Sequence, residues 1–96
     1  MKLSYVYILK CADATFYTGV TSNLDKRIIE HYNGIHPGSY TAKRRPLSLV
    51  FYAEFTDIQL AIMREKQIKK WSKAKKEALI EGSFEELPNL AKKKFK

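Results

Sequence analysis

The chain of 96 residues suits one domain, and its single cysteine excludes an internal disulfide and predicts a reducing compartment. No stretch is apolar enough for a secretion signal or a membrane span, so we expect a soluble cytoplasmic protein. Lysine and arginine number 18 against 10 acidic residues. This surplus favours a polyanionic partner, nucleic acid before acidic lipid, over a basic surface that merely keeps the protein soluble.

The first part of the sequence predicts two strands. Residues 3–9 and 16–21 are rich in β-branched and aromatic side chains, and residues 10–15 between them are expected to form a hairpin turn. The alternation of side chains does not show whether Tyr7 and Tyr17 share a face of the sheet, because a one-residue slip in register reverses the faces.

A helix is expected to follow the hairpin. Ser22 or Asn23 is its predicted N-cap, and Gly34 ends it. Its apolar stripe is expected to comprise Leu24, Ile28 and Tyr32. Residues 34–46 are rich in Gly, Pro and Ser and predict a surface loop that ends in a basic cluster.

The second part of the sequence predicts one strand and two helices. Residues 47–55 form the strand, and Thr56 with Gln59 forms a capping box that opens a helix. A further basic helix is expected over residues 73–81, with Ser72 as its cap. The apolar stripe of the middle helix is expected at Ile58, Ala61, Ile62 and Ile68. The order β-β-α-β-α-α predicts an α+β fold, in which helices pack on a small sheet.

Two pairs of polar side chains are candidates for a site. Tyr7 and Tyr17 place phenol groups on strands whose core requires only apolar side chains, so their hydroxyls either reach solvent or meet in a site. Arg27 and His31 are four residues apart and therefore share a helix face. They are either solvated boundary residues or an anion site, because a guanidinium binds phosphate through two parallel hydrogen bonds.

Glu65 occupies a position in the stripe of its helix where an aliphatic residue is expected. A carboxylate that faces a core must be paired, protonated or bound to a metal. Its pairing partner would be Lys69, one helical turn later. Two other residues give no such indication: His36 lacks a suitably spaced Cys or His partner for zinc, and Cys11 lacks support for a nucleophile.

Basic residues of the loop and of the last two helices are placed to follow a phosphate backbone. Such contacts give salt-sensitive binding that is largely independent of sequence. A solvated charged surface is the simpler interpretation of the same run. The residues predicted to bind nucleic acid are Lys43, Arg44, Arg45, Lys69, Lys70 and Lys73.

Together these residues give the chain a pattern that resembles the GIY-YIG nuclease family, most closely its small single-domain bacterial members. The order and spacing of the motifs carry the resemblance, which extends from Leu3 to about Ile80. The matching positions are Tyr5-Val6-Tyr7 for the first motif, Tyr17-Thr18-Gly19 for the second, Arg27 and His31 in the following helix, and Glu65 in a later helix.

The resemblance implies a three-stranded antiparallel sheet flanked by helices, and hydrolysis of DNA phosphodiesters with one Mg²⁺ or Mn²⁺ ion per site. It implies that Glu65 holds the ion and that Arg27 holds the phosphate. Tyr7 would take a proton from the attacking water with help from His31, while Tyr17 orients the water or phosphate. Since a free tyrosine has a pKa of about 10, the site is expected to lower the pKa of Tyr7.

The resemblance is incomplete at two positions. Tyr5 stands where the first motif has glycine, and the asparagine that many members carry near the end of the domain has Asn89 as its candidate here. Without that asparagine, cleavage is expected to be weak. We expect a nuclease domain over residues 1–83, followed by a cover segment and basic tail over residues 84–96.

The leading hypothesis is a metal-dependent DNA endonuclease, structure-selective or of low sequence specificity, acting in DNA repair or recombination. The alternative is a nucleic-acid-binding module that keeps the fold without catalysis. A third possibility is a basic adaptor for an acidic protein or membrane surface. Neither a membrane nor a small-molecule cofactor is expected in the leading case. The sequence leaves open DNA versus RNA, the natural substrate and the oligomeric state.

Overall fold

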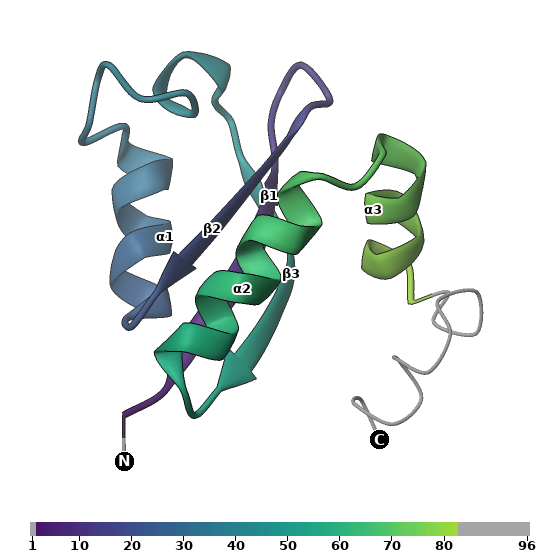
Figure 1. Cartoon of the computed structure of the whole chain (residues 1–96). Helices are drawn as coiled ribbons and strands as arrows, with labels where there is room; N and C mark the ends of the chain where they lie inside the picture. The colour runs from purple at the N-terminus through teal and green to yellow at the C-terminus, as the bar shows by residue number, and fades with distance from the viewer. Residues whose placement is uncertain (1, 83–96) are drawn as a thin grey trace.

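Three antiparallel strands form the centre of the computed structural model, which describes residues 2–82 (Figure 1). The strands are β1 (Ser4–Lys10), β2 (Phe16–Thr21) and β3 (Ser48–Phe55). Their order in the sheet is β2-β1-β3, so β1 is central and β2 is an edge strand. The predicted α+β fold and the element order β-β-α-β-α-α are therefore confirmed.

The first helix begins and ends where local chemistry predicts. Helix α1 (Leu24–Asn33) is capped by Asn23, whose side chain accepts a hydrogen bond from the backbone N–H of Lys26. Gly34 follows in the left-handed conformation with φ of 63°, which a glycine adopts at little cost. The loop after it contains a short 3₁₀ turn, η1 (Ala42–Arg44).

The cap of the next helix differs from the expected one. Helix α2 (Ile58–Lys69) is capped by Asp57, whose carboxylate accepts from the backbone N–H of Gln59, so the predicted Thr56 capping box is wrong. The carboxylate is a charged acceptor placed directly before the first helical residue, which favours it as the cap. Helix α3 (Lys73–Ile80) is capped by Ser72 as predicted.

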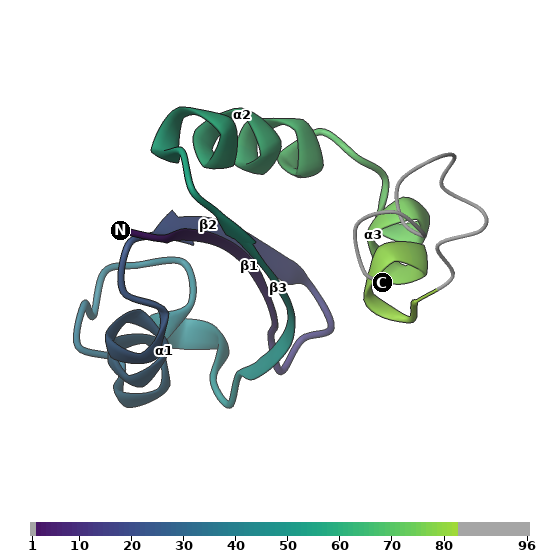
Figure 2. The same cartoon turned by 90° about the horizontal axis from the view of Figure 1, so that it is seen from below.

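The helices divide between the two faces of the sheet. Helix α1 covers one face, and α2 and α3 lie on the other (Figure 2). Val6 and Ile8 of β1 point toward α2 and α3, and they form an apolar core with Ala61, Ile68 and Leu79. The opposite face carries a second cluster, which comprises Tyr7, Leu9, Cys11 and Leu47.

The strand register answers the question that the sequence left open. Tyr7 of β1 lies directly opposite Gly19 of β2. Tyr17 is two residues before Gly19 and so points to the same face. Both phenols therefore face α1.

Two residues of the expected helical stripes are exposed. Ile58 is the first residue of α2 and is 41% exposed. Tyr32 is also exposed, and its hydroxyl accepts a hydrogen bond from the backbone N–H of Leu49. The buried side chains of α2 are Ala61, Glu65 and Ile68.

The predicted boundary at residues 83 and 84 and the candidate Asn89 lie outside the described residues. Within residues 2–82, no helix has the length and apolar character needed to cross a membrane.

Candidate active site

Tyr7 lies at the centre of the sheet with only 1% of its surface exposed. Its ring passes over the backbone of Gly19, its partner across the strand pair. A Cβ atom at position 19 would lie 2.4 Å from the Tyr7 hydroxyl oxygen, far inside van der Waals contact. The glycine of the second motif is therefore required by the close approach of the first-motif tyrosine.

The Tyr7 hydroxyl is joined to α1 through a buried histidine. Its oxygen lies 2.9 Å from Nε2 of His31, and Nδ1 of the same ring lies 2.9 Å from Oγ1 of Thr41. The three side chains come from β1, α1 and the loop before β3, and all three are buried. A neutral imidazole has one donor and one acceptor nitrogen, so this chain of hydrogen bonds has a direction that depends on the tautomer.

Tyr17 completes an aromatic cluster on this face. Its ring centroid lies 6.3 Å from that of Tyr7 and 5.3 Å from that of His31. On its other side the ring stacks on Tyr40, at 6.2 Å and an interplanar angle of 27°. The structure thus brings together three of the predicted site residues, Tyr7, Tyr17 and His31, in direct contact.

Arg27 lies one helical turn before His31 and keeps its side chain partly exposed. Its Nε is 3.8 Å from Oε1 of Glu30, a long and weak ion pair. Its positive charge acts on both buried groups, since it lowers the pKa of Tyr7 and that of His31. The guanidinium is therefore near enough to both groups to act on them electrostatically.

The pKa of Tyr7 moves in the opposite direction to the one expected. Burial raises it well above its ordinary value, and electrostatic interactions with Tyr17, Glu30 and Glu65 raise it further. Arg27 opposes this rise but does not reverse it. The expectation of a lowered pKa is wrong for the protein alone, because desolvation of the phenolate outweighs the single nearby cation.

His31 shows the corresponding effect on a base. Burial lowers its pKa, and the charge of Arg27 lowers it further, while Glu30 opposes them. The imidazole is therefore neutral at neutral pH, and one of its nitrogens is available as a hydrogen-bond acceptor.

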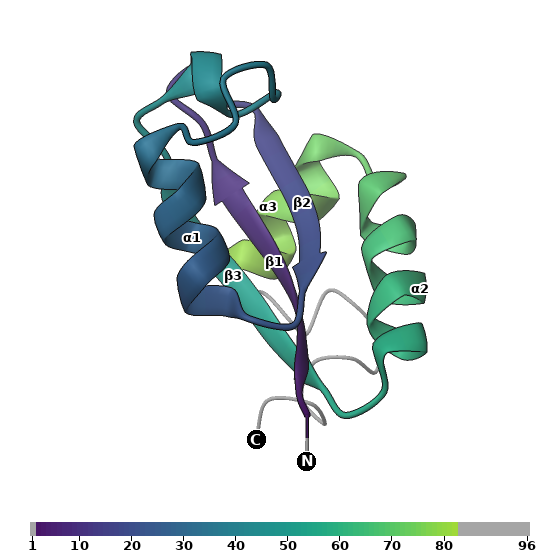
Figure 3. The same ribbon diagram turned by 90° about the vertical axis from the view of Figure 1, so that its left-hand side faces the viewer.

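Glu65 approaches from the opposite layer. Its helix, α2, packs on β1 and β2, across the sheet from α1 (Figure 3). Glu65 is 7% exposed, and its Oε2 lies 2.6 Å from Nζ of Lys69. The inward position is confirmed, and so is the pairing with Lys69 one turn later. The charge of Glu65 also contributes to the raised pKa of Tyr7, so the two groups are electrostatically coupled.

These positions can be compared with those of known proteins. A family model described as the GIY-YIG catalytic domain matches residues 3–78, a range that includes Tyr7, Tyr17, Arg27, His31 and Glu65. The chain belongs to the GIY-YIG family. Membership favours a nuclease-type function.

Similar proteins are small members of the same family. A UPF0213 protein of Syntrophus aciditrophicus is 44% identical over 87 residues, which cover 91% of this chain and 100% of that protein. A UPF0213 protein of Natronomonas pharaonis is 46% identical over 76 residues, covering 79% and 88% of the two chains. The solution NMR structure of a UPF0213 protein of Bacillus halodurans is 37% identical, covers 93% and 97%, and superposes with a TM-score of 0.55. Their names state no activity.

The GIY-YIG resemblance implies a divalent metal, and the donor chemistry of Glu65 fits one. Its carboxylate supplies hard oxygen ligands, which Mg²⁺ and Mn²⁺ prefer. Residues 2–82 contain no group of three or more His, Cys, Asp or Glu side chains that could hold an ion together. Mg²⁺ commonly binds through one or two carboxylates and keeps several waters, which is compatible with Glu65 as a ligand.

Three of the predicted nucleic-acid ligands form ion pairs or hydrogen bonds within the described part of this GIY-YIG domain, and one of them is Lys69 through its pairing with Glu65. Arg44 pairs with Asp13 and lies over the ring of Tyr40, and Arg45 donates hydrogen bonds to the backbone carbonyl oxygens of Ala42 and Tyr32. Both arginines thus hold the loop in place. Contacts of the six predicted basic residues with phosphate remain a prediction.

Sequence reasoning missed Thr41 and Tyr40. Both lie in the loop after α1, where the composition predicts a loop but gives no period from which a facing direction can be inferred. Thr41 is nevertheless 1% exposed. A buried threonine inside a polar surface loop can be found only once the loop is placed against the sheet.

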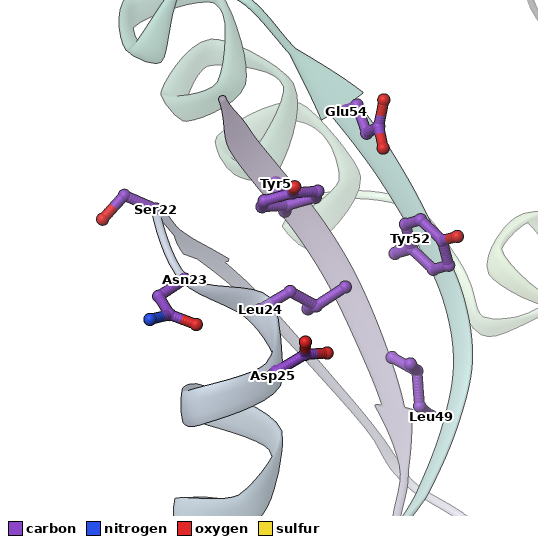
Figure 4. A pocket seen from close by; sticks show the side chains of 8 residues that line it. All are labelled: Tyr5, Ser22, Asn23, Leu24, Asp25, Leu49, Tyr52 and Glu54. Atoms are coloured by element: carbon purple, nitrogen blue, oxygen red, sulfur yellow. The ribbon is translucent and has the colours of Figure 1, made fainter. Parts of the chain in front are cut away.

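A separate hollow lies at the N-terminal end of α1. Its volume is about 360 Å³, and it is open to solvent between α1 and the strands β1 and β3 (Figure 4). Its floor includes Tyr5 and Tyr52, whose rings meet edge to face at 6.4 Å. None of the five predicted catalytic residues lines it. The candidate active site is therefore the buried Tyr7 cluster and not this hollow.

Proposed function

We propose that the protein is a metal-dependent endonuclease that hydrolyses DNA phosphodiester bonds. The observation that carries the proposal is the 2.9 Å hydrogen bond between the buried hydroxyl of Tyr7 and a neutral His31. A core needs no such pair, because phenylalanine and an aliphatic residue would fill the same space without polar groups to satisfy. Family membership supports a nuclease-type function for it.

The Tyr7–His31 pair would allow proton transfer from water even though the pKa of the tyrosine is raised. A free phenolate is disfavoured in this site, so Tyr7 is a poor base by itself. If Nε2 of His31 accepts the phenol proton while the phenol oxygen takes a proton from water, no buried phenolate has to accumulate. The proton passes from water through Tyr7 to His31, and a hydroxide equivalent attacks phosphorus. The 1% exposure of Tyr7 restricts this role to a water bound in the site.

The other site residues have separate tasks in the proposal. Arg27 is partly exposed and weakly paired, so its guanidinium is available to bind the scissile phosphate and to offset negative charge in the transition state. Tyr17 orients the water or the phosphate from beside the His31 ring. Glu65 would hold Mg²⁺ or Mn²⁺, and such an ion, when bound, stabilises the charge on the leaving oxygen.

The charge of the chain supports a nucleic-acid substrate. A formal charge of +8 on 96 residues favours binding to phosphate backbones. Contacts of this kind carry little sequence information, so we expect selection of DNA by structure, or low sequence specificity. An enzyme of that kind suits DNA repair or recombination. Cleavage of RNA is measured in the same experiment, because the charge does not distinguish RNA from DNA.

The experiment is cleavage of supercoiled plasmid and of branched DNA and RNA, with Mg²⁺, Mn²⁺ or EDTA. We expect the wild type to cut with metal and Glu65→Gln to lose at least about 10²-fold in rate, while DNA binding is retained. A wild type that cuts no better than Glu65→Gln would show that the assignment is wrong. Salt-sensitive DNA binding without metal-dependent cleavage would then favour the non-catalytic nucleic-acid-binding module.

A further inference from the structure

Thr41 contacts His31 of the candidate catalytic pair, at the ring nitrogen that does not face Tyr7. Its side chain is 1% exposed, and its Oγ1 lies 2.9 Å from Nδ1 of His31 and 3.4 Å from Oγ of Ser39. The proposed chemistry gives this threonine no direct part. Its hydroxyl nevertheless continues the chain of hydrogen bonds that begins at Tyr7.

The direction of this chain follows from what each hydroxyl can donate to. Among the described residues, Nε2 of His31 is the one hydrogen-bond partner of the Tyr7 hydroxyl. If Nε2 carried the proton, the buried phenol hydrogen would have no protein acceptor among the described residues, which is unfavourable. With the proton on Nδ1, Tyr7 donates to Nε2, Nδ1–H donates to Thr41, and the Thr41 hydroxyl can donate to Ser39.

The segment that carries Thr41 is held firmly against the hairpin turn. The Tyr40 hydroxyl donates to Oγ1 of Thr15 over 2.9 Å, and Nε of Arg44 donates to Oδ2 of Asp13 over 3.2 Å. The guanidinium of Arg44 also lies 3.8 Å from the centre of the Tyr40 ring. Thr41 thus sits between residues that are fixed to a different part of the chain.

The contacts of Asp13 reinforce this attachment. Its carboxylate accepts hydrogen bonds from the backbone N–H and the hydroxyl of Thr15, and these bonds lower its pKa. Asp13 is therefore ionised at neutral pH and available to Arg44. The backbone N–H of Ala12 also donates to the carbonyl oxygen of Arg44 over 2.8 Å.

We propose that Thr41 is a positioning residue that fixes His31 in the tautomer with the proton on Nδ1. This keeps Nε2 free to accept the proton of Tyr7, so the inference rests on the proposed relay. The clamp of Tyr40 and Arg44 on the hairpin turn holds Thr41 at the distance this requires. The loop between α1 and β3 is then part of the active-site support as well as a candidate DNA contact.

The test combines the tautomer of His31 with the kinetics of cleavage. The full-length protein with ¹⁵N-labelled histidine rings is compared with Thr41→Val and Thr41→Ser by long-range ¹H–¹⁵N NMR. We expect the Nδ1–H tautomer in the wild type, its loss in Thr41→Val and its return in Thr41→Ser. The cleavage kcat should fall about 10- to 100-fold in Thr41→Val, with little change in KM, and recover in Thr41→Ser.

Thr18→Val is the matched control. Thr18 is also a buried threonine, but its Oγ1 has no hydrogen-bond partner among the described residues, and it faces α2. This substitution should leave both the His31 tautomer and kcat unchanged. A wild type with the proton on Nε2, or a Thr41→Val that keeps the Nδ1–H tautomer, would overturn the proposal. So would a Thr41→Val that changes the tautomer but cuts at the wild-type rate.

The two readouts separate this proposal from the proposed function. If the wild type cleaves no substrate, the proposed function fails, and the positioning role for that reaction fails with it. The NMR comparison would still decide whether Thr41 sets the tautomer. If the wild type cleaves DNA and the NMR result is negative, only the inference about Thr41 fails.

Discussion

The two faces of the central strand are built in different ways. On one face, Val6 and Ile8 are fully buried in an apolar cluster against α2 and α3. On the other, the residue between them, Tyr7, is equally buried but is hydrogen-bonded to His31. The same strand therefore supports an apolar core and a polar one, separated by the thickness of the sheet.

This difference indicates which face stabilises the fold and which face is suited to chemistry. Apolar burial is non-directional and stabilises the fold in proportion to the area removed from water. A buried hydroxyl or imidazole costs free energy unless each polar atom finds a partner. Burial of the polar side chains of Tyr7, His31 and Thr41 on one face is therefore better explained by a functional site than by the needs of a core.

The largest contrast is expected between neighbouring residues of β1. Tyr7→Phe keeps the ring but removes the hydroxyl, so cleavage should fall by about 10²- to 10⁴-fold, while the free energy of unfolding falls by about 1–3 kcal/mol. Ile8→Ala should lower the free energy of unfolding by about 2–5 kcal/mol and leave the rate per folded molecule unchanged. Urea denaturation and single-turnover cleavage measure the two effects.

Two outcomes would contradict this division of roles between the two faces of β1. If Ile8→Ala lowers the rate per folded molecule as strongly as Tyr7→Phe, both faces contribute to the chemistry. If Tyr7→Phe cuts at the wild-type rate, the Tyr7 hydroxyl does not accept the proton of the attacking water.

The next effect concerns the space that Gly19 leaves for the Tyr7 ring. Gly19→Ala places a methyl group 2.4 Å from the phenol oxygen, so the ring must move away from its position. Overpacking of this kind costs about 1–3 kcal/mol, and cleavage should fall with the displaced hydroxyl. Gly38→Ala is the matched control, because a Cβ there meets no atom within 4 Å. Thermal unfolding and cleavage should show Gly38→Ala within about 0.5 kcal/mol of the wild type. Equal behaviour of the two variants would contradict the steric role of Gly19.

Much of the fold could be predicted because its determinants are local. The residues of β2, 16–21, were expected from their composition, and Gly34 ends α1 because it adopts a left-handed conformation. The inward position of Glu65 also followed from the helical period, since Ala61 and Ile68 lie on the same buried side.

Other features could not be predicted because they depend on register or on loop placement. The shared face of Tyr7 and Tyr17 is set by the pairing of Tyr7 with Gly19, which alternation within one strand does not define. The role of Thr41 depends on a loop without periodicity. The direction of the Tyr7 pKa shift depends on burial, which the sequence motif does not contain.

A smaller effect is expected for the ion pair of Glu65 and Lys69 beside the apolar face. The Glu65 carboxylate is held by the Lys69 ammonium at 2.6 Å, and this contact raises the pKa of Lys69. A divalent cation at Glu65 would have to compete with that ammonium. Lys69→Met should therefore strengthen Mg²⁺ binding by about 2- to 5-fold, as expected for a partly exposed ion pair.

Isothermal titration calorimetry without DNA measures this affinity. Lys70→Met is the control, because it removes the same charge from an exposed neighbour, whereas the Glu65 carboxylate is ion-paired with Lys69. If both variants bind Mg²⁺ equally, net charge explains the change and Lys69 does not compete at Glu65. If Lys69→Met weakens binding, the ammonium supports the ion site.

The smallest effect is the dependence of stability on pH through the polar face. Burial lowers the pKa of His31 in the folded protein below the value of about 6.5 expected when unfolded. As the pH falls through this range, the unfolded state binds more protons than the folded state, so the free energy of unfolding decreases. The contribution of His31 is complete above about 6.5 and is lost as the pH falls through its folded pKa, with a slope below about 1.4 kcal/mol per pH unit.

Urea denaturation of the wild type and of His31→Gln between about pH 5 and pH 7.5 isolates this contribution, because the other titrating groups are common to both. The difference between the two free energies of unfolding should shift against the wild type on acidification. A difference that stays constant would mean that His31 titrates as it does in the unfolded chain. A shift in favour of the wild type would mean that a nearby carboxylate stabilises the imidazolium. The second result would remove the neutral acceptor on which the relay through Tyr7 depends, and the first would show that burial does not perturb the imidazole.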